Sequence, residues 1–371
     1  MNRRDFGRIA GLSAVGALGH NLKNGMGEPL STAEQTPKEK RALMKVGCQS
    51  IPMTVKGMQF AKRYGVDNIC AYPKMTPDRR WEVNELKTLK ELCESQGVSL
   101  DLMPLPLESN NVKDKVFPNI FLGKSPERDR EIDLINDMIR ASAQAEIFCL
   151  KYNLSMLEVL RTESTPGRGG STYSTWVYEK APKNLPLTIA GPVPAEVFWE
   201  RITYFLERII PVATEYKVRM ACHPHDPGVP PSGYRGVDRV LGTIDGLKHF
   251  IEISPGPYHG LNLCLGTVAE NLQDPANEIF DVIRHFGTRK KIFNIHFRNI
   301  KGKRDNFQEV YPDEGDVNMY KVMKTLKEVE YPYLCMPDHI PHHPDDPDGR
   351  QAFAFCYGYI KALIQAVDET V

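Results

Sequence analysis

Apolar and polar residues alternate along this chain in a strand–helix rhythm that begins at Met44. Short apolar runs favour strands, and the longer stretches between them place apolar residues three and four apart, as amphipathic helices do. Trp81–Gln96 is the clearest helix, because Leu86, Leu89 and Cys93 share one face. The predicted strands are Met44–Ser50, Val66–Ala71, Val98–Met103, Ile147–Tyr152, Val218–Cys222, Leu261–Cys264, Ile292–Phe297 and Tyr333–Met336. The predicted helices are Thr54–Tyr64, Trp81–Gln96, Ser125–Ala143, Ala195–Tyr216, Arg235–Ile251, Val268–Phe286, Val317–Val329 and Arg350–Ala366.

Strands that alternate with helices predict a parallel α/β sheet, and eight such units predict closure into a single (β/α)8 TIM barrel over residues 41–371. An open, doubly wound sheet is the alternative, but neither a G-x-G-x-x-G nor a G-x-x-x-x-G-K-[ST] phosphate cradle is present. A long polar loop insertion, Asn153–Pro194, follows the fourth strand. On a barrel it would lie over the mouth, either as a disordered loop or as a lid over the substrate.

Four successive predicted strands end in residues that bind metals. The clearest is KKIFNIHFRN at 290–299, an apolar strand that ends in His296. The strands before and after it end near His223, Cys264 and Asp338. Because strand ends converge at one face of a barrel, two imidazoles, a thiol and a carboxylate would meet there. This mixed set suits a divalent transition metal better than calcium or magnesium.

Two further polar residues follow His296 at the same strand end. Arg298 could hold a substrate carboxylate in a two-pronged contact, or it could form an ion pair with a neighbouring acid. Asn299 comes next, and we expect it to bind substrate. Both interpretations rest on the barrel placing these side chains at its mouth.

Charge and cysteine content narrow the functional classes. Lysine plus arginine equals aspartate plus glutamate, at 47 each, so nothing points to nucleic acid as a partner. The hydrophobic fraction of 41% is typical of a globular protein, and no apolar run after the N-terminus could span a bilayer. The eight scattered cysteines are expected to be mostly reduced core residues.

The N-terminal 40 residues are expected to lie outside the barrel domain. Arg3 and Arg4 precede a short, weakly apolar stretch, which is the arrangement of a twin-arginine export signal, and a polar linker follows. This signal predicts export of the folded protein to the bacterial periplasm or cell envelope. That route carries proteins whose metal is already bound, so a metal enzyme would suit it.

Several motifs of the chain resemble the mannonate dehydratases, a family of xylose-isomerase-like barrels. They are FLERIIPVATEYKVRMACHPHDP at 205–227, GLNLCLGT at 260–267, IHFRNI at 295–300, FQEVYPDEGDVNMYKVMKTL at 307–326 and MPDH at 336–339. The resemblance runs from about Trp81 to the C-terminus. It implies a hydro-lyase of glucuronate catabolism that converts D-mannonate to 2-keto-3-deoxy-D-gluconate and water, with manganese or iron(II) as cofactor.

The resemblance also implies roles for particular residues. The family's metal ligands fall on His223, Cys264, His296 and Asp338, the four residues that the strand ends indicate. His339 matches a catalytic histidine, and dehydration needs such an acid or base because C2 must lose a proton and the 3-hydroxyl must gain one. Asn153 and Arg161 resemble substrate-binding positions of the family.

One family residue has no counterpart here. The catalytic tyrosine expected shortly after the PDH motif is missing from residues 349–355, and Tyr357 is the nearest tyrosine. Tyr311, His343 and Tyr357 are therefore the candidates to complete the acid/base pair, with Tyr357 assigned as catalytic.

The sequence is compatible with three functions. The first is dehydration of a sugar acid, the second is isomerisation or epimerisation of a sugar in the same barrel, and the third is metal-assisted binding without catalysis. A small sugar acid is the expected partner in the first and third cases. The sequence allows a homo-oligomer but does not decide whether one forms.

Overall fold

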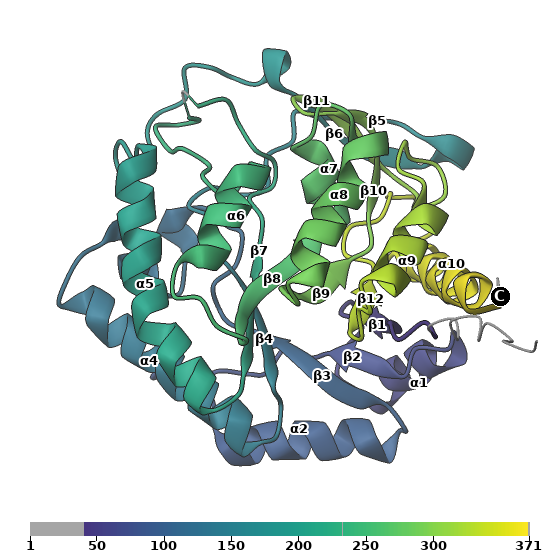
Figure 1. Ribbon diagram of the computed structural model, residues 1–371, viewed down its shortest axis with the longest axis horizontal. Helices are drawn as coiled ribbons and strands as arrows, with labels where there is room; N and C mark the ends of the chain where they lie inside the picture. Colours follow the sequence, from purple (N-terminus) through teal and green to yellow (C-terminus); the bar gives the residue numbers. More distant parts are fainter. Residues whose placement is uncertain (1–40, 232, 370–371) are drawn as a thin grey trace, which may run out of the picture. The chain divides into compact units, whose positions relative to one another are not determined.

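The computed structural model describes residues 41–231 and 233–369. The predicted export signal and linker, residues 1–40, lie outside this part of the chain. Eight parallel strands close into a barrel in the order β1-β12-β9-β8-β7-β4-β3-β2, which confirms the predicted fold (Figure 1). The barrel strands are β1 (Lys45–Cys48), β2 (Asn68–Cys70), β3 (Ser99–Pro104), β4 (Cys149–Asn153), β7 (Arg219–His223), β8 (His259–Cys264), β9 (Ile292–His296) and β12 (Leu334–Met336).

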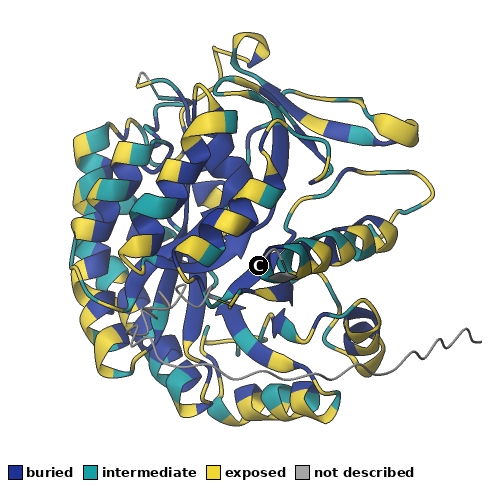
Figure 2. Ribbon diagram, turned by 45° about the vertical axis from the view of Figure 1, so that its right-hand side comes forward, coloured by how far each residue is buried: buried dark blue, intermediate teal, exposed yellow. Residues whose placement is uncertain are grey.

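Helices surround the barrel and bury the faces that their apolar spacing predicts (Figure 2). In α5, Phe198, Ile202, Phe205 and Ile209 are all buried, and they recur every three or four residues. The helices are α1 (Val55–Arg63), α2 (Val83–Ser95), α3 (Pro118–Leu122), α4 (Glu127–Gln144), α5 (Ala195–Glu215), α6 (Ile244–Glu252), α7 (Leu265–Glu270), α8 (Pro275–Thr288), α9 (Met319–Glu328) and α10 (Arg350–Glu369). No helix in the described ranges is both long and apolar enough to cross a membrane.

The insertion after β4 is more ordered than the predicted loop. It contributes β5 (Glu163–Pro166) and β6 (Thr172–Val177), which pair with the hairpin of β10 (Asn299–Lys303) and β11 (Asn306–Val310). We call this four-stranded antiparallel sheet, in the order β10-β11-β6-β5, the cap sheet. Trp176 of β6 lies opposite Phe307 of β11, and both are almost completely buried. Burial of such large aromatic side chains stabilises the cap sheet, although the polar composition of the insertion did not predict strands there.

Two helices differ from their predicted ranges. The predicted Arg235–Ile251 helix begins only at Ile244, because Arg239 turns inward and donates to the Pro227 carbonyl oxygen at 2.8 Å. The predicted Val268–Phe286 helix is divided into α7 and α8. Between them, the Asn271 side chain accepts a hydrogen bond from Gly228 N at 2.7 Å, and Pro275 starts the new helix.

The N-terminus of α4 also departs from expectation. The helix was predicted to start at Ser125, but it begins after Pro126 and has no side-chain capping hydrogen bond there. All eight cysteines are free and buried, as predicted.

Candidate active site and metal centre

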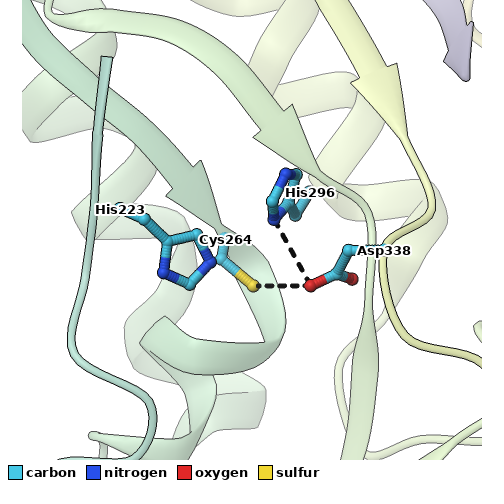
Figure 3. A group of neighbouring side chains, drawn as sticks. All are labelled: His223, Cys264, His296 and Asp338. Carbon is cyan, nitrogen blue, oxygen red and sulfur yellow. Dashed lines mark hydrogen bonds and ion pairs between the residues drawn. The ribbon is translucent and has the colours of Figure 1, made fainter. Parts of the chain in front are cut away.

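The barrel brings His223, Cys264, His296 and Asp338 together at the carboxyl ends of β7, β8, β9 and β12 (Figure 3). One ligand atom from each residue can be chosen so that all four lie within 4.8 Å of one another. The register explains this proximity, because His296 is paired with Cys264 on one side and with Met336, two residues before Asp338, on the other. We call these four residues the quartet.

Contacts around the quartet hold its side chains in place. The Asp338 carboxylate lies 3.3 Å from His296 Nδ1, and Cys264 Sγ donates to it at 3.6 Å. His223 Nδ1 is hydrogen-bonded to the Pro224 carbonyl oxygen at 2.6 Å, which leaves Nε2 available. On the far side of the other imidazole, His296 Nε2 is hydrogen-bonded to the Asn262 amide at 3.2 Å. Such second contacts of metal-binding imidazoles fix the ring orientation.

The protonation states of the quartet suit a cation. Burial lowers the pKa of His223 to about 3, and the neighbouring His296 adds to the effect. Burial also lowers the pKa of His296 to about 4, although Asp338 opposes it. Burial raises the pKa of the Asp338 carboxyl, but Arg298, His296 and His339 together outweigh it and hold that pKa well below its usual range. Two neutral imidazoles therefore face a carboxylate.

Unpaired atoms in the quartet also fit a bound metal ion. Asp338 Oδ1 is buried and has no hydrogen-bond partner, and His296 Nδ1, although 3.3 Å from the other Asp338 oxygen, forms no hydrogen bond either. Burial of polar atoms without a partner is costly. Coordination of an ion would satisfy both atoms, so the quartet fits a divalent transition metal.

A buried ion network lies beside the quartet. Arg298 Nη2 contacts Asp226 at 2.7 Å, and Arg298 Nη1 contacts Glu309 at 2.6 Å. Arg161 Nη1 contacts the other Asp226 oxygen at 2.8 Å, and Arg161 Nη2 pairs with Glu309. Burial and the Asp226 charge raise the pKa of Glu270, the third carboxyl of this group, so we infer that it is protonated. Two guanidinium groups are thus matched by two carboxylates.

His339 joins the network to the quartet. Its Nδ1 lies 2.8 Å from Glu309 Oε1 and also contacts Arg298 Nη1. Arg298 donates to that same Glu309 oxygen, so we assign the Nδ1 proton to the imidazole and Glu309 as its acceptor. Burial lowers the pKa of His339, but the neighbouring carboxylates of Glu309 and Asp338 together outweigh it and raise that pKa to about 9. With 39% of its side chain exposed, His339 can reach a ligand at the barrel mouth.

Several of the predicted substrate-binding residues contact other parts of the protein in the structure. Arg298 and Arg161 are paired with the protein's own carboxylates, which is the ion-pair arrangement weighed for Arg298. Asn299 is 1% exposed, and its amide binds only backbone groups, including the carbonyl oxygens of Pro312 and Val317. Asn299 therefore shapes the 312–317 turn, and these contacts use its amide within the protein.

Tyr357 is not at the site. It is fully buried in α10, and its hydroxyl is hydrogen-bonded to Cys48 Sγ at 2.8 Å, in the layer between α10 and β1. The helical spacing of 350–366 places Tyr357 on the apolar face of α10. Its hydroxyl is therefore packed inside the protein and does not face the barrel mouth. By contrast, Asn153 ends β4 directly opposite His223 and does lie at the mouth.

Three network residues were absent from the predicted site. Asp226 lies three positions after His223, whereas Glu270 and Glu309 lie in α7 and β11. Asp226 and Glu309 fall within motifs that the sequence made prominent, HPHDP and FQEVYP. Nothing local marks Glu270, because its burial depends on α7 packing against β8 and β10.

Removal of Arg298 should strongly destabilise the fold. Arg298→Met leaves Asp226 and Glu309 buried with one partner fewer, and breaking a buried ion network costs about 3–5 kcal/mol. We expect the free energy of unfolding, measured by urea denaturation, to fall by that amount. Arg284→Met is the matched control, because Arg284 pairs with Glu328 on the exposed surface and its loss should cost about 0–1 kcal/mol. Equal losses in the two variants would contradict the importance of the network.

Comparisons with known proteins agree with this fold. The D-mannonate dehydratase (UxuA) family model matches residues 187–370. A mannonate dehydratase of Thermotoga neapolitana is 29% identical over 294 residues, which cover 70% of this chain and 78% of the relative. Mannonate dehydratase 2 of Halalkalibacterium halodurans is also 29% identical, over 70% of this chain and 79% of its own length. The crystal structure of mannonate dehydratase from Streptococcus suis serotype2 has a TM-score of 0.74 at 23% identity and covers 88% of this chain and 94% of its own.

These findings define the chain as a (β/α)8 barrel with a candidate metal centre at its mouth. The D-mannonate dehydratase model covers just under half of the chain, residues 187–370, and this part supplies all four residues of the quartet. In this part the chain is similar to the mannonate dehydratases.

Proposed function

We propose that this protein is a metal-dependent sugar-acid dehydratase that converts D-mannonate to 2-keto-3-deoxy-D-gluconate and water. The observation that carries the proposal is the quartet with His339 beside it, in a chain similar over 70% of its length to mannonate dehydratases. The enzyme would be a hydro-lyase, since it breaks a carbon–oxygen bond without hydrolysis or oxidation.

The metal that suits the quartet is manganese or iron(II). The His223, His296 and Asp338 side chains offer nitrogen and oxygen ligands. Cys264, a thiol whose proton metal binding would displace, adds a soft sulfur ligand that calcium and magnesium do not favour. A divalent ion held there supplies Lewis-acid stabilisation of negative charge next to the substrate carboxylate. We propose that the quartet binds one of these two ions.

The enol forms through two proton transfers. C2 loses its proton, the electrons form a C2–C3 double bond, and the C3–O bond breaks while the hydroxyl leaves as water after protonation. The resulting enol then takes a proton at C3 and releases the proton of its C2 hydroxyl, which gives the 2-keto product. His339 is the chain's proton-transfer group in this scheme, because it lies next to Asp338 and is partly exposed at the mouth. Glu309 holds its Nδ1, so the proton is exchanged at Nε2.

The other acid/base candidates have partners away from His339. The Tyr311 hydroxyl is hydrogen-bonded to Ser171 at 3.0 Å, and His343 Nε2 to the Gly169 carbonyl oxygen at 3.1 Å. Tyr311, which follows β11, and His343, which precedes α10, are therefore both bonded to the insertion after β4. Asn153, opposite His223, remains the predicted residue best placed to bind substrate hydroxyls.

Proton NMR in deuterium oxide tests the reaction. We expect metal-loaded protein to convert D-mannonate to a product whose C3 carries one hydrogen and one deuterium, because the enol takes its proton from solvent. Protein dialysed against a chelator is the control and should give no product. Deuterium exchange at C2 without loss of the 3-hydroxyl would assign the protein to the epimerases instead.

Absence of both exchange and product, with metal bound and across a panel of C5 and C6 aldonates, would contradict a catalytic role. The surviving interpretation would then be a metal-containing protein that binds sugar acids. Export by the twin-arginine route and the presence of oligomers remain predictions on which the described residues do not bear.

A further inference from the structure

The interior of the barrel contains a lysine that the quartet and the ion network leave without a counter-ion. Side chains of β4 alternate, with Leu150 and Tyr152 packed outward in the core shared with the helices and Cys149 inside the barrel. Lys151 therefore points inward, as does Asn153. In the register with β7, Lys151 pairs with Ala221 and Asn153 with His223, so Lys151 lies one inward-facing position below the mouth.

Lys151 has only neutral neighbours. The residue is 8% exposed, and its Nζ donates to the Gln49 side-chain oxygen at the end of β1. The ring of Tyr72, which follows β2, lies 5.7 Å from Nζ. Within residues 41–231 and 233–369, Lys151 forms no salt bridge with any carboxylate. A buried ammonium without a counter-ion is costly, so buried charges are ordinarily paired.

The cations nearest the quartet differ from Lys151 in this respect. Arg161, Arg298 and His339 each contact Asp226 or Glu309. Their charges are used within the protein, and they leave no free cation for a substrate anion. Lys151 is nevertheless close enough to the quartet for its charge to contribute to the lowered pKa of His296.

We propose that Lys151 is a specificity-determining residue that binds the carboxylate of a sugar acid between β4 and the quartet. Gln49, Tyr72 and Asn153, at the ends of β1, β2 and β4, would form the wall of the site around this anion. This inference rests on the proposed function, since it assigns an anionic substrate to the same site. A neutral sugar would leave the Lys151 charge unpaired, and for this reason the site selects acids over ketoses and polyols.

Calorimetric binding to metal-loaded protein tests this role with matched ligands. D-Mannonate and D-mannitol share their hydroxyl pattern but differ in the carboxylate. We expect wild type to prefer D-mannonate, and Lys151→Met to weaken its binding about 10- to 100-fold, which is the loss expected for one charge-assisted hydrogen bond. D-Mannitol binding and metal content should stay within about threefold of wild type, because neither depends on the ammonium.

Two further variants separate charge from packing. Lys151→Arg keeps the cation and should retain the preference for D-mannonate, and Lys151→Gln replaces Lys151→Met if the latter does not fold. Lys291→Met is the control, because Lys291 lies at the opposite end of the barrel, where it donates to the carbonyl oxygens of Gly256 and His259. It should leave both dissociation constants unchanged.

The experiments distinguish a failure of the role of Lys151 from a failure of the proposed dehydration. If wild type prefers D-mannonate and Lys151→Met removes that preference, the role of Lys151 stands even when NMR detects no turnover. If Lys151→Met keeps the preference, or wild type has none, the role is wrong even when D-mannonate is dehydrated. Loss of the preference in Lys151→Arg as well as Lys151→Met would assign Lys151 to packing and overturn the proposal.

Discussion

Cys264→Ser is expected to lower the affinity of the protein for its metal by at least about 100-fold, since loss of mere outer partners of a metal ligand costs about 10- to 100-fold. Cys264 is fully buried and offers the one soft ligand of the quartet. A serine hydroxyl of nearly the same size is a far poorer ligand for manganese or iron(II). The variant should therefore keep the barrel and lose the ion.

Elemental analysis after dialysis against a weak chelator measures the effect directly. Wild type should retain about one ion per chain, the number that a single four-ligand site holds. Cys264→Ser should retain almost none, and the rise in melting temperature that metal gives wild type should disappear.

Cys93→Ser is the matched control. Cys93 is as deeply buried, but it lies in α2 and outside the quartet, so the variant should bind metal like wild type. Equal metal content in the two variants, or no metal in wild type grown in manganese- and iron-supplemented medium, would show that the quartet is not a metal centre.

The barrel was predictable because its pattern is local and repeated. Eight apolar runs alternating with helical periodicity permit few other folds, and convergence of strand ends at one face follows from parallel strands. The quartet could thus be assembled from four strand ends without any knowledge of distances. His223 and His296 needed no more than their position after an apolar run.

The ion network was not predictable in the same way. Arg298 was correctly placed at a strand end, but whether a guanidinium faces substrate or the protein's own acids depends on residues far away in sequence. Asp226 and Glu309 lie 72 and 11 positions from Arg298, and only folding brings both within hydrogen-bond distance of it. Sequence pattern gives residue types and strand ends, and it gives no information on which charges are already paired.

The cap sheet was not predicted because each of its two segments gives only a weak strand signal on its own, and the strands form by pairing with each other. The insertion reads as a polar loop when taken alone, and so does the turn after His296. In the structure, β6 and β11 pair through three successive residues and bury Trp176 against Phe307. This pairing also carries Glu309, one position after the paired residues, to His339. A tertiary contact therefore both forms the sheet and completes the candidate site.

Replacement of His339 tests the assigned chemistry most directly. We expect His339→Asn to lower kcat by about 10²- to 10⁴-fold, the usual contribution of one general acid or base. The asparagine amide can still donate to Glu309 in place of Nδ1, so the ion network should survive, whereas the group that exchanges a proton at Nε2 is removed. Metal content and the melting temperature should stay close to wild type, because His339 is outside the quartet and partly exposed.

His285→Asn is the control for this substitution. His285 lies in α8 against Phe286, on the outer layer of the barrel, and its replacement should leave kcat unchanged. Turnover of D-mannonate by metal-loaded protein, followed by release of the 2-keto product, gives the rate for each variant. Undiminished kcat in His339→Asn would mean that another group moves the proton. A loss of activity that accompanies a loss of metal would instead make His339 a support of Asp338, the ligand that precedes it in the chain.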